Sequence, residues 1–332
     1  MSLQGLFLFV AVISLGNIVL AQDTIKVGIT HWGDVRSHLV PMQKNDLPND
    51  CQGGSGNCVG GIPEIAAYIK DTEGNFHKDA NTKLRFATGN LVSGETGYLS
   101  VPDFGRRPGH TDYADSGWKT FGKFLKSIEY WNETTEYYSP TFMSLGIKEF
   151  ESGPLPLSLY LAEANTTTIV SNMKGSYQGL ANLIKSSVVQ NLPNNRQIGI
   201  VGFVNPLAND LADASPLSFA DPAEEIASLI KNDATLRGLK TIIAVGSGNY
   251  NMAKSIIDKC DNVKLVIYGG GTKDLTNNYP AKEGKGWIAT AGLTNGVATR
   301  LGALTLTLSV DSELVNVTGQ LRELSITLPQ GT

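Results

Sequence analysis

The sequence lacks the features that mark several large protein classes. With 27 Lys and Arg against 31 Asp and Glu, the net charge is −4, and no basic stripe of the kind that binds nucleic acid or anionic membranes is present. No long apolar run follows the first 21 residues, and no internal repeat or low-complexity linker divides the chain. No Gly-x-Ser-x-Gly motif occurs, which excludes a serine nucleophile on a strand-turn-helix elbow. A single domain without a nucleic-acid or membrane partner is therefore expected.

Cysteine is also scarce, with only Cys51, Cys58 and Cys260 in 332 residues. Cys51 and Cys58 bracket a Gly-rich hexapeptide, which can close a small disulfide loop in an oxidising compartment. A metal-binding cysteine pair is the alternative, but no second Cys/His pair stands at suitable spacing. Cys260 follows an apolar helical pattern and is expected to be an unpaired, buried thiol.

The apolar run from Leu6 to Ala21 is short for a membrane span, and it ends in a small-residue cleavage site. We interpret residues 1–21 as a secretory signal peptide, residues 22–320 as the folded domain and residues 321–332 as a tail without a hydrophobic anchor. An uncleaved anchor is the alternative. Three glycosylation sequons agree with a secreted, extracellular protein, and they begin at Asn132, Asn165 and Asn316.

Strand and helix patterns alternate along most of the chain. Buried strands are predicted near residues 24–30, 83–87, 142–145, 158–162, 198–204, 241–245 and 263–268. Helices are predicted near residues 62–69, 118–131, 221–230 and 252–257, and antiparallel strands close the chain at 287–291 and 299–310. Asp221-Pro-Ala-Glu224 is typical of a helix start, with Asp as the N-cap. The order predicts an α/β layered sandwich with mixed sheets flanked by helices.

Functional residues of such sheets gather on the loops that leave the strand carboxyl ends. Five of these loops, in order, resemble motifs of the 5'-nucleotidase/apyrase family, whose catalytic domain is a calcineurin-like metallophosphoesterase. The matching segments are Thr30-His-Trp-Gly-Asp-Val-Arg-Ser-His38, Ala87-Thr-Gly-Asn-Leu-Val-Ser-Gly94, Leu145-Gly-Ile-Lys-Glu-Phe150, Val245-Gly-Ser-Gly248 and Gly269-Gly-Gly-Thr272. The likeness extends from about residue 24 to residue 317. The C-terminal nucleotide-binding domain of that family, which supplies a base clamp, has no counterpart before Thr332.

The resemblance implies where the family's two-metal centre would stand. Asp34 matches a ligand, whereas the His two residues later is Arg36 and the bridging Asp is Asn90. The Asn ligand is matched by Ile147 and the neighbouring catalytic His by Lys148, and the two later His ligands by Ser247 and Gly271. His31 and Glu149 match family residues that support the loops.

These replacements predict that the dinuclear centre is lost. One anionic ligand is gone, and two cations have arrived where divalent ions would sit. A unit charge pair at 4 Å is worth roughly 4 kcal/mol at an effective dielectric near 20. Ile147 and Gly271 have no donor atom for a metal. We therefore expect a secreted pseudoenzyme that holds no cofactor and binds a small ligand or an extracellular protein.

Several alternatives stay open from the sequence. Arg36 and Lys148 form either an internal ion-pair cluster with Asp34 and Glu149, or an anion site together with the amides of Gly270 and Gly271. A residual phosphoesterase with a single divalent metal around Asp34, Asn90 and Asn249 is a second hypothesis for the function. A protein-interaction module that uses the polar loop over residues 88–117 is a third.

Overall fold

The fold was analysed in a computed structural model, which describes residues 24–36, 42–43, 58–92, 117–130, 139–210, 214–271, 275, 277–293 and 298–325. Several predicted features lie outside these residues. They are the signal peptide, Cys51, the sequon at Asn132, most of the loop over residues 88–117 and the end of the tail. The domain boundaries, the disulfide and the glycosylation therefore stay predictions.

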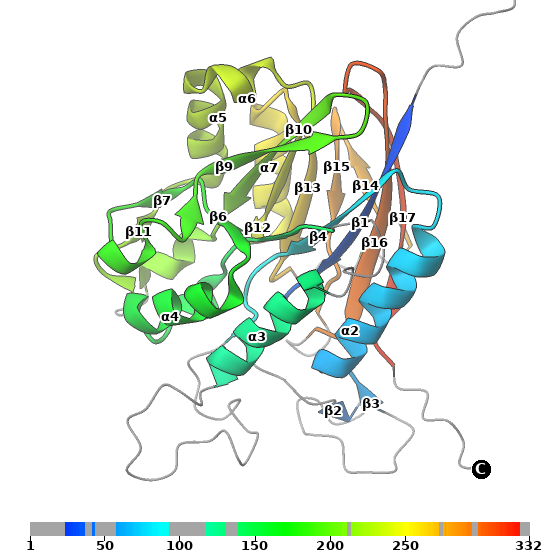
Figure 1. Cartoon of the computed structure of the whole chain (residues 1–332). Helices are drawn as coiled ribbons and strands as arrows, with labels where there is room; N and C mark the ends of the chain where they lie inside the picture. The colour runs from blue at the N-terminus through cyan, green and yellow to red at the C-terminus, as the bar shows by residue number, and fades with distance from the viewer. Residues whose placement is uncertain are drawn as a thin grey trace, which may run out of the picture.

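Two mixed β-sheets pack face to face (Figure 1). The first has the order β17-β16-β1-β4-β5-β6-β8 and the second β14-β15-β13-β12-β10-β9. The strands of the first sheet are β1 (Ile25–Trp32), β4 (Thr82–Ala87), β5 (Thr141–Met143), β6 (Thr167–Ile169), β8 (Ile184–Lys185), β16 (Arg300–Leu308) and β17 (Leu314–Glu323). Those of the second are β9 (Ser187–Leu192), β10 (Arg196–Phe203), β12 (Ile242–Ser247), β13 (Val263–Gly269), β14 (Ala281–Glu283) and β15 (Gly286–Ala289).

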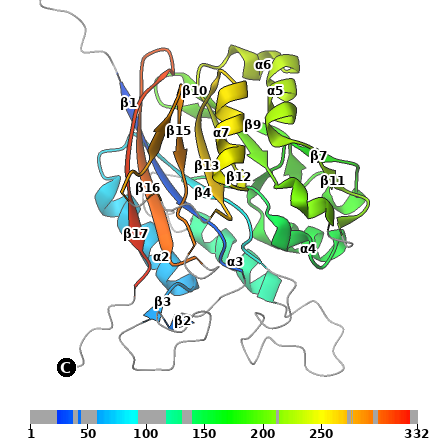
Figure 2. The same cartoon turned by 180° about the vertical axis from the view of Figure 1, so that it is seen from behind.

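Helices cover the outer face of each sheet. Figure 1 shows α2 (Ile62–Asp71) and α3 (Gly117–Tyr130) in front of the first sheet, and Figure 2 shows α7 (Tyr250–Lys259) in front of the second. The other helices are α4 (Pro154–Ala164), α5 (Pro222–Asn232) and α6 (Ala234–Gly238), with a π-helical turn η1 (Thr72–Phe76) and 3-10 turns η3 (Ile147–Phe150), η4 (Gln178–Leu180) and η5 (Pro206–Asp210). Short strands β2 (Met42–Gln43) and β3 (Cys58–Val59) pair with each other, as do β7 (Met173–Lys174) and β11 (Ser218–Phe219).

Three hydrophobic clusters hold these four layers together. Residues of β1, β4, β10, β12 and β13 fill the space between the two sheets, as in the cluster of Val27, Phe86, Ile200 and Ile267. Of the two further clusters, one lies between the first sheet and its helices and the other between the second sheet and its helices. Because strand side chains alternate, β1 supplies Ile29 to the inter-sheet core and Trp32 to the helix-facing core. The predicted layered α/β sandwich is confirmed.

The prediction of a strand at residues 158–162 was wrong. These residues lie inside α4, which begins with Pro154 after Gly153 and ends at Ala164, with Asn165 as its C-cap in the left-handed conformation (φ 50°). The helix is apolar on nearly all sides. One face packs on α3 and the first core, while Leu155 and Leu159 on the other side are exposed. Apolar residues at alternate positions therefore mimicked a strand.

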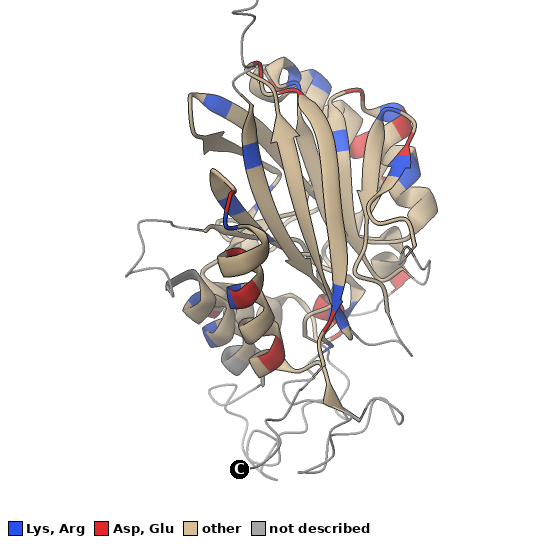
Figure 3. Ribbon diagram, turned by 90° about the vertical axis from the view of Figure 1, so that its right-hand side faces the viewer, with Lys and Arg blue, Asp and Glu red and all other residues tan. Residues whose placement is uncertain are grey.

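The ribbon in Figure 3 carries charged residues of both signs on its helices and loops, and the long strands are uncharged over most of their length. None of the described helices has the length and hydrophobicity that a membrane span requires. The sequons at Asn165 and Asn316 lie on exposed positions, at the C-cap of α4 and on β17.

Candidate functional site

The five predicted loops leave the carboxyl ends of parallel strands and meet at one edge of the two sheets. Asp34 follows β1, Asn90 follows β4 and η3 follows β5 in the first sheet. In the second sheet, Ser247 ends β12 and Gly270 follows β13. Strands β1, β4 and β5 are parallel to one another, as are β12 and β13. The sheet topology thus brings together residues that are more than 200 positions apart in the sequence.

The side-chain amide of Asn90 stands at the centre of this meeting point. Its Nδ2 donates to Oδ1 of Asp34 at 2.9 Å and to Oγ of Ser247 at 3.0 Å. Its Oδ1 accepts the backbone N–H of Lys148 at 3.1 Å. Since a carboxylate accepts and a backbone N–H donates, only this orientation of the amide satisfies both neighbours. Asn90 therefore links three loops through a buried hydrogen-bond network.

Asp34 supplies the carboxylate of this network. Its Oδ2 accepts the backbone N–H of Gly270 at 2.5 Å. Burial raises the pKa of Asp34, while the hydrogen bonds from Asn90 and Gly270 and the charge of Arg36 act in the opposite direction. The side chain is thus supplied with donors from both sheets.

Glu149 joins two of the loops by accepting hydrogen bonds from their backbone amides. Its Oε2 accepts the backbone N–H groups of Asn90 at 2.8 Å and Gly146 at 2.6 Å, and its Oε1 accepts those of Leu91 at 2.5 Å and Val92 at 3.2 Å. The residue is fully buried, and burial raises the pKa of Glu149 to about 7 although these four amides favour its charged form. Its role is to hold the loops after β4 and β5.

The backbone of the first-sheet loops is in an uncommon conformation. Asp34, Arg36 and Asn90 have φ values of 59°, 49° and 52°, in the left-handed region that Asn and Asp tolerate better than Arg. Backbone bonds from Asp34 N to Gly89 O (3.0 Å) and from Arg36 N to Asn90 O (2.9 Å) hold these loops against each other. Such conformations persist only where the surroundings enforce them, and they cluster at functional sites.

Of the two basic residues, Lys148 is paired differently from the ion-pair cluster that the sequence suggested. Lys148 Nζ forms an ion pair with Glu151 at 2.5 Å, one turn along η3, and Glu149 is occupied by backbone amides. Arg36 is half-buried and lowers the pKa of Asp34 through its charge. Ile147 packs against the first core cluster. The amide of Gly270 is committed to Asp34, so one donor of the suggested anion site is already in use.

His31 lies behind the site on β1. Its Nε2 is hydrogen-bonded to the hydroxyl of Tyr279, while its buried Nδ1 has no partner among the residues that the structure describes. Burial lowers the pKa of His31 to about 3, so the ring is neutral at physiological pH. Sequence reasoning assigned a supporting role to His31 but missed Tyr279, because 248 residues separate the two.

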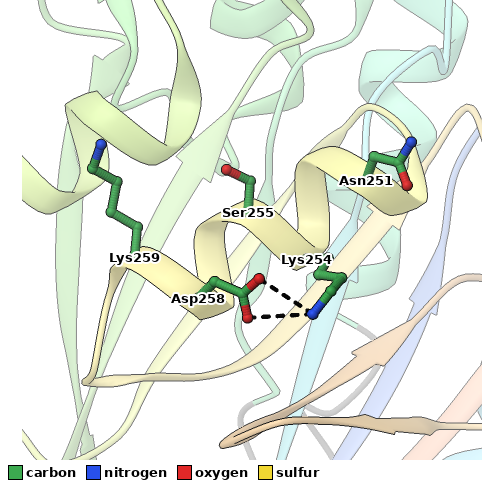
Figure 4. Close-up of a pocket in the computed structure, with 5 residues that line it drawn as sticks. All are labelled: Asn251, Lys254, Ser255, Asp258 and Lys259. Carbon is green, nitrogen blue, oxygen red and sulfur yellow. Dashed lines mark hydrogen bonds and ion pairs between the residues drawn. The ribbon is translucent and has the colours of Figure 1, made fainter.

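The site is closed. Asp34, Asn90 and Ser247 have exposed fractions of 2%, 5% and 2%. A surface hollow lies elsewhere, along the outer face of α7, and is lined by Asn251, Lys254, Ser255, Asp258 and Lys259 (Figure 4). The Lys254–Asp258 ion pair in it is an ordinary helix-surface pair at 3.2 Å. None of its lining residues belongs to the five loops.

The donor set does not fit a pair of divalent ions. In the part of the chain that the structure describes, no three His, Cys, Asp or Glu side chains are close enough to one another to hold a metal. Asn90 turns its N–H₂ group, which cannot coordinate a cation, toward Asp34 and Ser247. The carboxylate oxygens of Asp34 already accept two hydrogen bonds. The described residues at this point are therefore arranged to bond to one another rather than to a metal.

Two curated proteins resemble this chain in sequence over most of its length. Protein 5NUC of Lutzomyia longipalpis is 22% identical over 271 residues, which cover 79% of this chain and 42% of that protein. A 5'-nucleotidase-related protein of Glossina morsitans morsitans is 25% identical over 277 residues, 78% of this chain and 44% of that protein. No protein-family model matches. The chain is a relative of the 5'-nucleotidases.

Solved structures show the same fold. The 5'-nucleotidase precursor of Thermus thermophilus superposes with a TM-score of 0.65 at 18% identity, over 90% of this chain and 55% of that one. The calcineurin-like phosphoesterase YfkN of Bacillus subtilis superposes with a TM-score of 0.61 at 16% identity, over 91% of each chain. The fold is therefore that of the 5'-nucleotidase metallophosphoesterase domain. The chain spans less than half the length of the two curated relatives.

Proposed function

We propose that this 5'-nucleotidase relative is a secreted protein that does not hydrolyse nucleotides and acts by binding a small ligand or an extracellular protein. The scaffold and the loop positions of the family are kept, while the residues at the meeting point of the loops support each other. Binding is then a property of other surfaces, since the side chains of Asp34, Asn90 and Ser247 are buried and bonded to one another.

One observation carries the proposal. Asn90 occupies the position that, by resemblance, belongs to the carboxylate bridging two metals, and its amide donates to Asp34 at 2.9 Å. A carboxylate there would repel Asp34 without cations between them, whereas the amide attracts it. The network thus fulfils with hydrogen bonds the structural task that metals fulfil in a dinuclear site.

The alternative of a residual single-metal phosphoesterase is less well supported. Asn249 was one of its three candidate ligands, and its Oδ1 accepts the N–H of Met252 at 3.0 Å as the N-cap of α7. The Oδ1 of Asn90 accepts the Lys148 amide. Only Asp34 is left among the three with oxygens directed into the site.

Secretion rests on the N-terminal apolar run and the exposed positions of two sequons. Expression of the full chain in cultured eukaryotic cells tests it: the protein should appear in the medium, lacking its first residues and shifted in mass by an endoglycosidase. Retention in the cell with an intact N-terminus would contradict this part of the proposal.

The central experiment measures metal content and turnover on the same purified chain. Elemental analysis after exposure to Zn²⁺ and Mn²⁺ should find well below one metal per chain, and phosphate release from ATP, ADP and AMP with Mg²⁺, Ca²⁺, Mn²⁺ or Zn²⁺ should stay at the buffer rate. A 5'-nucleotidase assayed in parallel is the positive control. Stoichiometric metal together with turnover that Asp34→Ala abolishes would refute the proposal.

A thermal-shift screen with nucleotides, amines and lipids then separates the two kinds of binding. A concentration-dependent rise of the melting temperature identifies a small-ligand binder. If no compound shifts the transition, a protein partner is the remaining form of the proposal, and crosslinking in the extracellular fluid of the source tissue is the next test.

A further inference from the structure

Three consecutive glycines stand at the end of β13 and in the loop that follows it, and each lacks a side chain for a different reason. A Cβ on Gly269 would lie 2.8 Å from Oδ2 of Asp34. Gly270 has a φ of 81°, which L-residues rarely adopt. Gly271 has no such backbone requirement, because its φ lies outside the left-handed region. At position 271 the obstacle to a side chain is therefore a neighbouring group and not the backbone conformation.

The ring of Tyr268 occupies that space. A Cβ added to Gly271 would lie 3.0 Å from Cζ and 3.0 Å from the hydroxyl oxygen of Tyr268, and nearer still to Cε2. Tyr268 lies at the end of β13, is fully buried and packs in the core between the second sheet and its helices. Because protein interiors are close-packed, moving this ring away from an added side chain would displace its neighbours in that cluster.

The hydroxyl of Tyr268 has no hydrogen-bond partner among the described residues, although it is buried. Burial also raises the pKa of Tyr268 to about 12, so the group is neutral. An unpaired buried hydroxyl costs roughly 1 to 3 kcal/mol. Tyr268 is thus a poor choice for an apolar core on polarity alone, and the volume of its ring is what the fold uses.

We propose that Tyr268 is a plug that fills the place of a side chain at position 271 and so prevents that position from contributing a metal ligand. By resemblance, this is where the family places a His ligand. A large residue at 268 and a glycine at 271 then form a compensating pair, three residues apart in the sequence. The inference rests on the proposed function and adds that restoring the ligands alone cannot rebuild the centre.

A double-mutant cycle tests the plug without any metal. Gly271→Ala should lower the melting temperature of the otherwise unchanged chain by roughly 3 to 10 °C, because the added methyl group overlaps the ring. In the Tyr268→Val background the same substitution should have almost no effect, because the smaller side chain leaves room. The matched control is Val266→Ala, a reduction of a buried side chain on the same strand and in the same cluster, which should leave the Gly271→Ala penalty unchanged.

A second arm reads out metal binding in chains with restored ligands. Arg36→His, Asn90→Asp, Ile147→Asn, Lys148→His, Ser247→His and Gly271→His are introduced together, with or without the additional substitution Tyr268→Val. Calorimetric titration with Mn²⁺ should show binding at least about tenfold tighter in the chain that carries Tyr268→Val, and circular dichroism confirms that both chains fold. If the restored chains do not fold, the double-mutant cycle decides alone.

The outcomes separate the two proposals. Additive effects of Gly271→Ala and Tyr268→Val, or equal Mn²⁺ affinity with and without Tyr268, would overturn the plug and leave the proposed function standing. Metal binding and nucleotide turnover by the unchanged chain would instead refute the proposed function, and the cycle would still report whether Tyr268 excludes a side chain at 271.

Discussion

The loops of the two sheets contribute to the site in opposite ways. Those of the first sheet carry its charged and amide groups, Asp34, Asn90 and Glu149, on a backbone with three residues in the left-handed region. Those of the second sheet contribute a serine hydroxyl and two glycines, Gly269 and Gly270, that lie close against Asp34. The first sheet thus supplies the hydrogen bonds that fix the loops, and the second supplies small residues that permit close approach. Substitutions in the loops of the first sheet should therefore destabilise the protein more than substitutions in those of the second.

The largest effect is expected at Glu149. Glu149→Ala leaves four buried backbone N–H groups without their acceptor, and we expect a loss of about 4 kcal/mol in the free energy of unfolding. Urea denaturation measures it. The control is Glu151→Ala on the same turn, which removes a partly exposed ion pair and should cost less than about 1 kcal/mol. Equal losses for the two variants would show that Glu149 does not hold the loops.

Asn90→Asp should be the next most damaging change. It places a second buried carboxylate beside Asp34 without a cation, for a loss of about 3 kcal/mol at neutral pH. Burial and the neighbouring charge raise the pKa of the new carboxyl, so the loss should shrink as the pH falls and the group becomes neutral. Asn249→Asp makes the same chemical change at a helix N-cap, where Asp is equally suitable, and should be nearly neutral. An Asn90→Asp chain as stable as the parent would contradict the amide-centred network.

His31 should make the protein sensitive to acid. The pKa of His31 is about 3 in the folded chain and near 6.5 when unfolded, so its contribution is complete above pH 6.5 and is lost as the pH falls below that value. Between pH 7 and pH 5 the parent should lose about 2 kcal/mol more than His31→Asn, which cannot titrate. Denaturation curves at both pH values test this; parallel losses would show that His31 is not held neutral by burial.

The smallest effect is expected in the second sheet. Ser247→Ala removes one acceptor of the Asn90 amide and should cost about 1 kcal/mol, because the Asp34 and Lys148 bonds of that amide remain. If this variant loses as much stability as Glu149→Ala, the asymmetry between the sheets is refuted.

Much of this arrangement could be predicted from the sequence, because it follows local rules. Buried strands that end in polar turns placed Asp34, Asn90 and Ser247 at one edge, and Asp221 caps α5 as its Asp-Pro-Ala-Glu pattern indicated. Helix α4 was missed because it is apolar on nearly all sides, so its sequence shows no helical period. The pairing of Lys148 with Glu151 was missed because it depends on the 3-10 turn η3, which brings residues three apart together.

Other features depend on tertiary contacts that no sequence period reveals. Tyr279 reaches His31 across 248 residues. The four amides that surround Glu149 come from two loops whose approach is set by the sheet. The sequence places Tyr268 directly before three glycines, but the direction of its ring required the structure.

Crystals of the intact chain grown with excess Mn²⁺ would test the central claim most directly through an anomalous-difference map at the manganese absorption edge. We expect no peak between Asp34 and Ser247, with the Asn90 amide still bonded to both. Two ordered peaks there, with Asn90 rotated to present its oxygen, would contradict a site held together by hydrogen bonds.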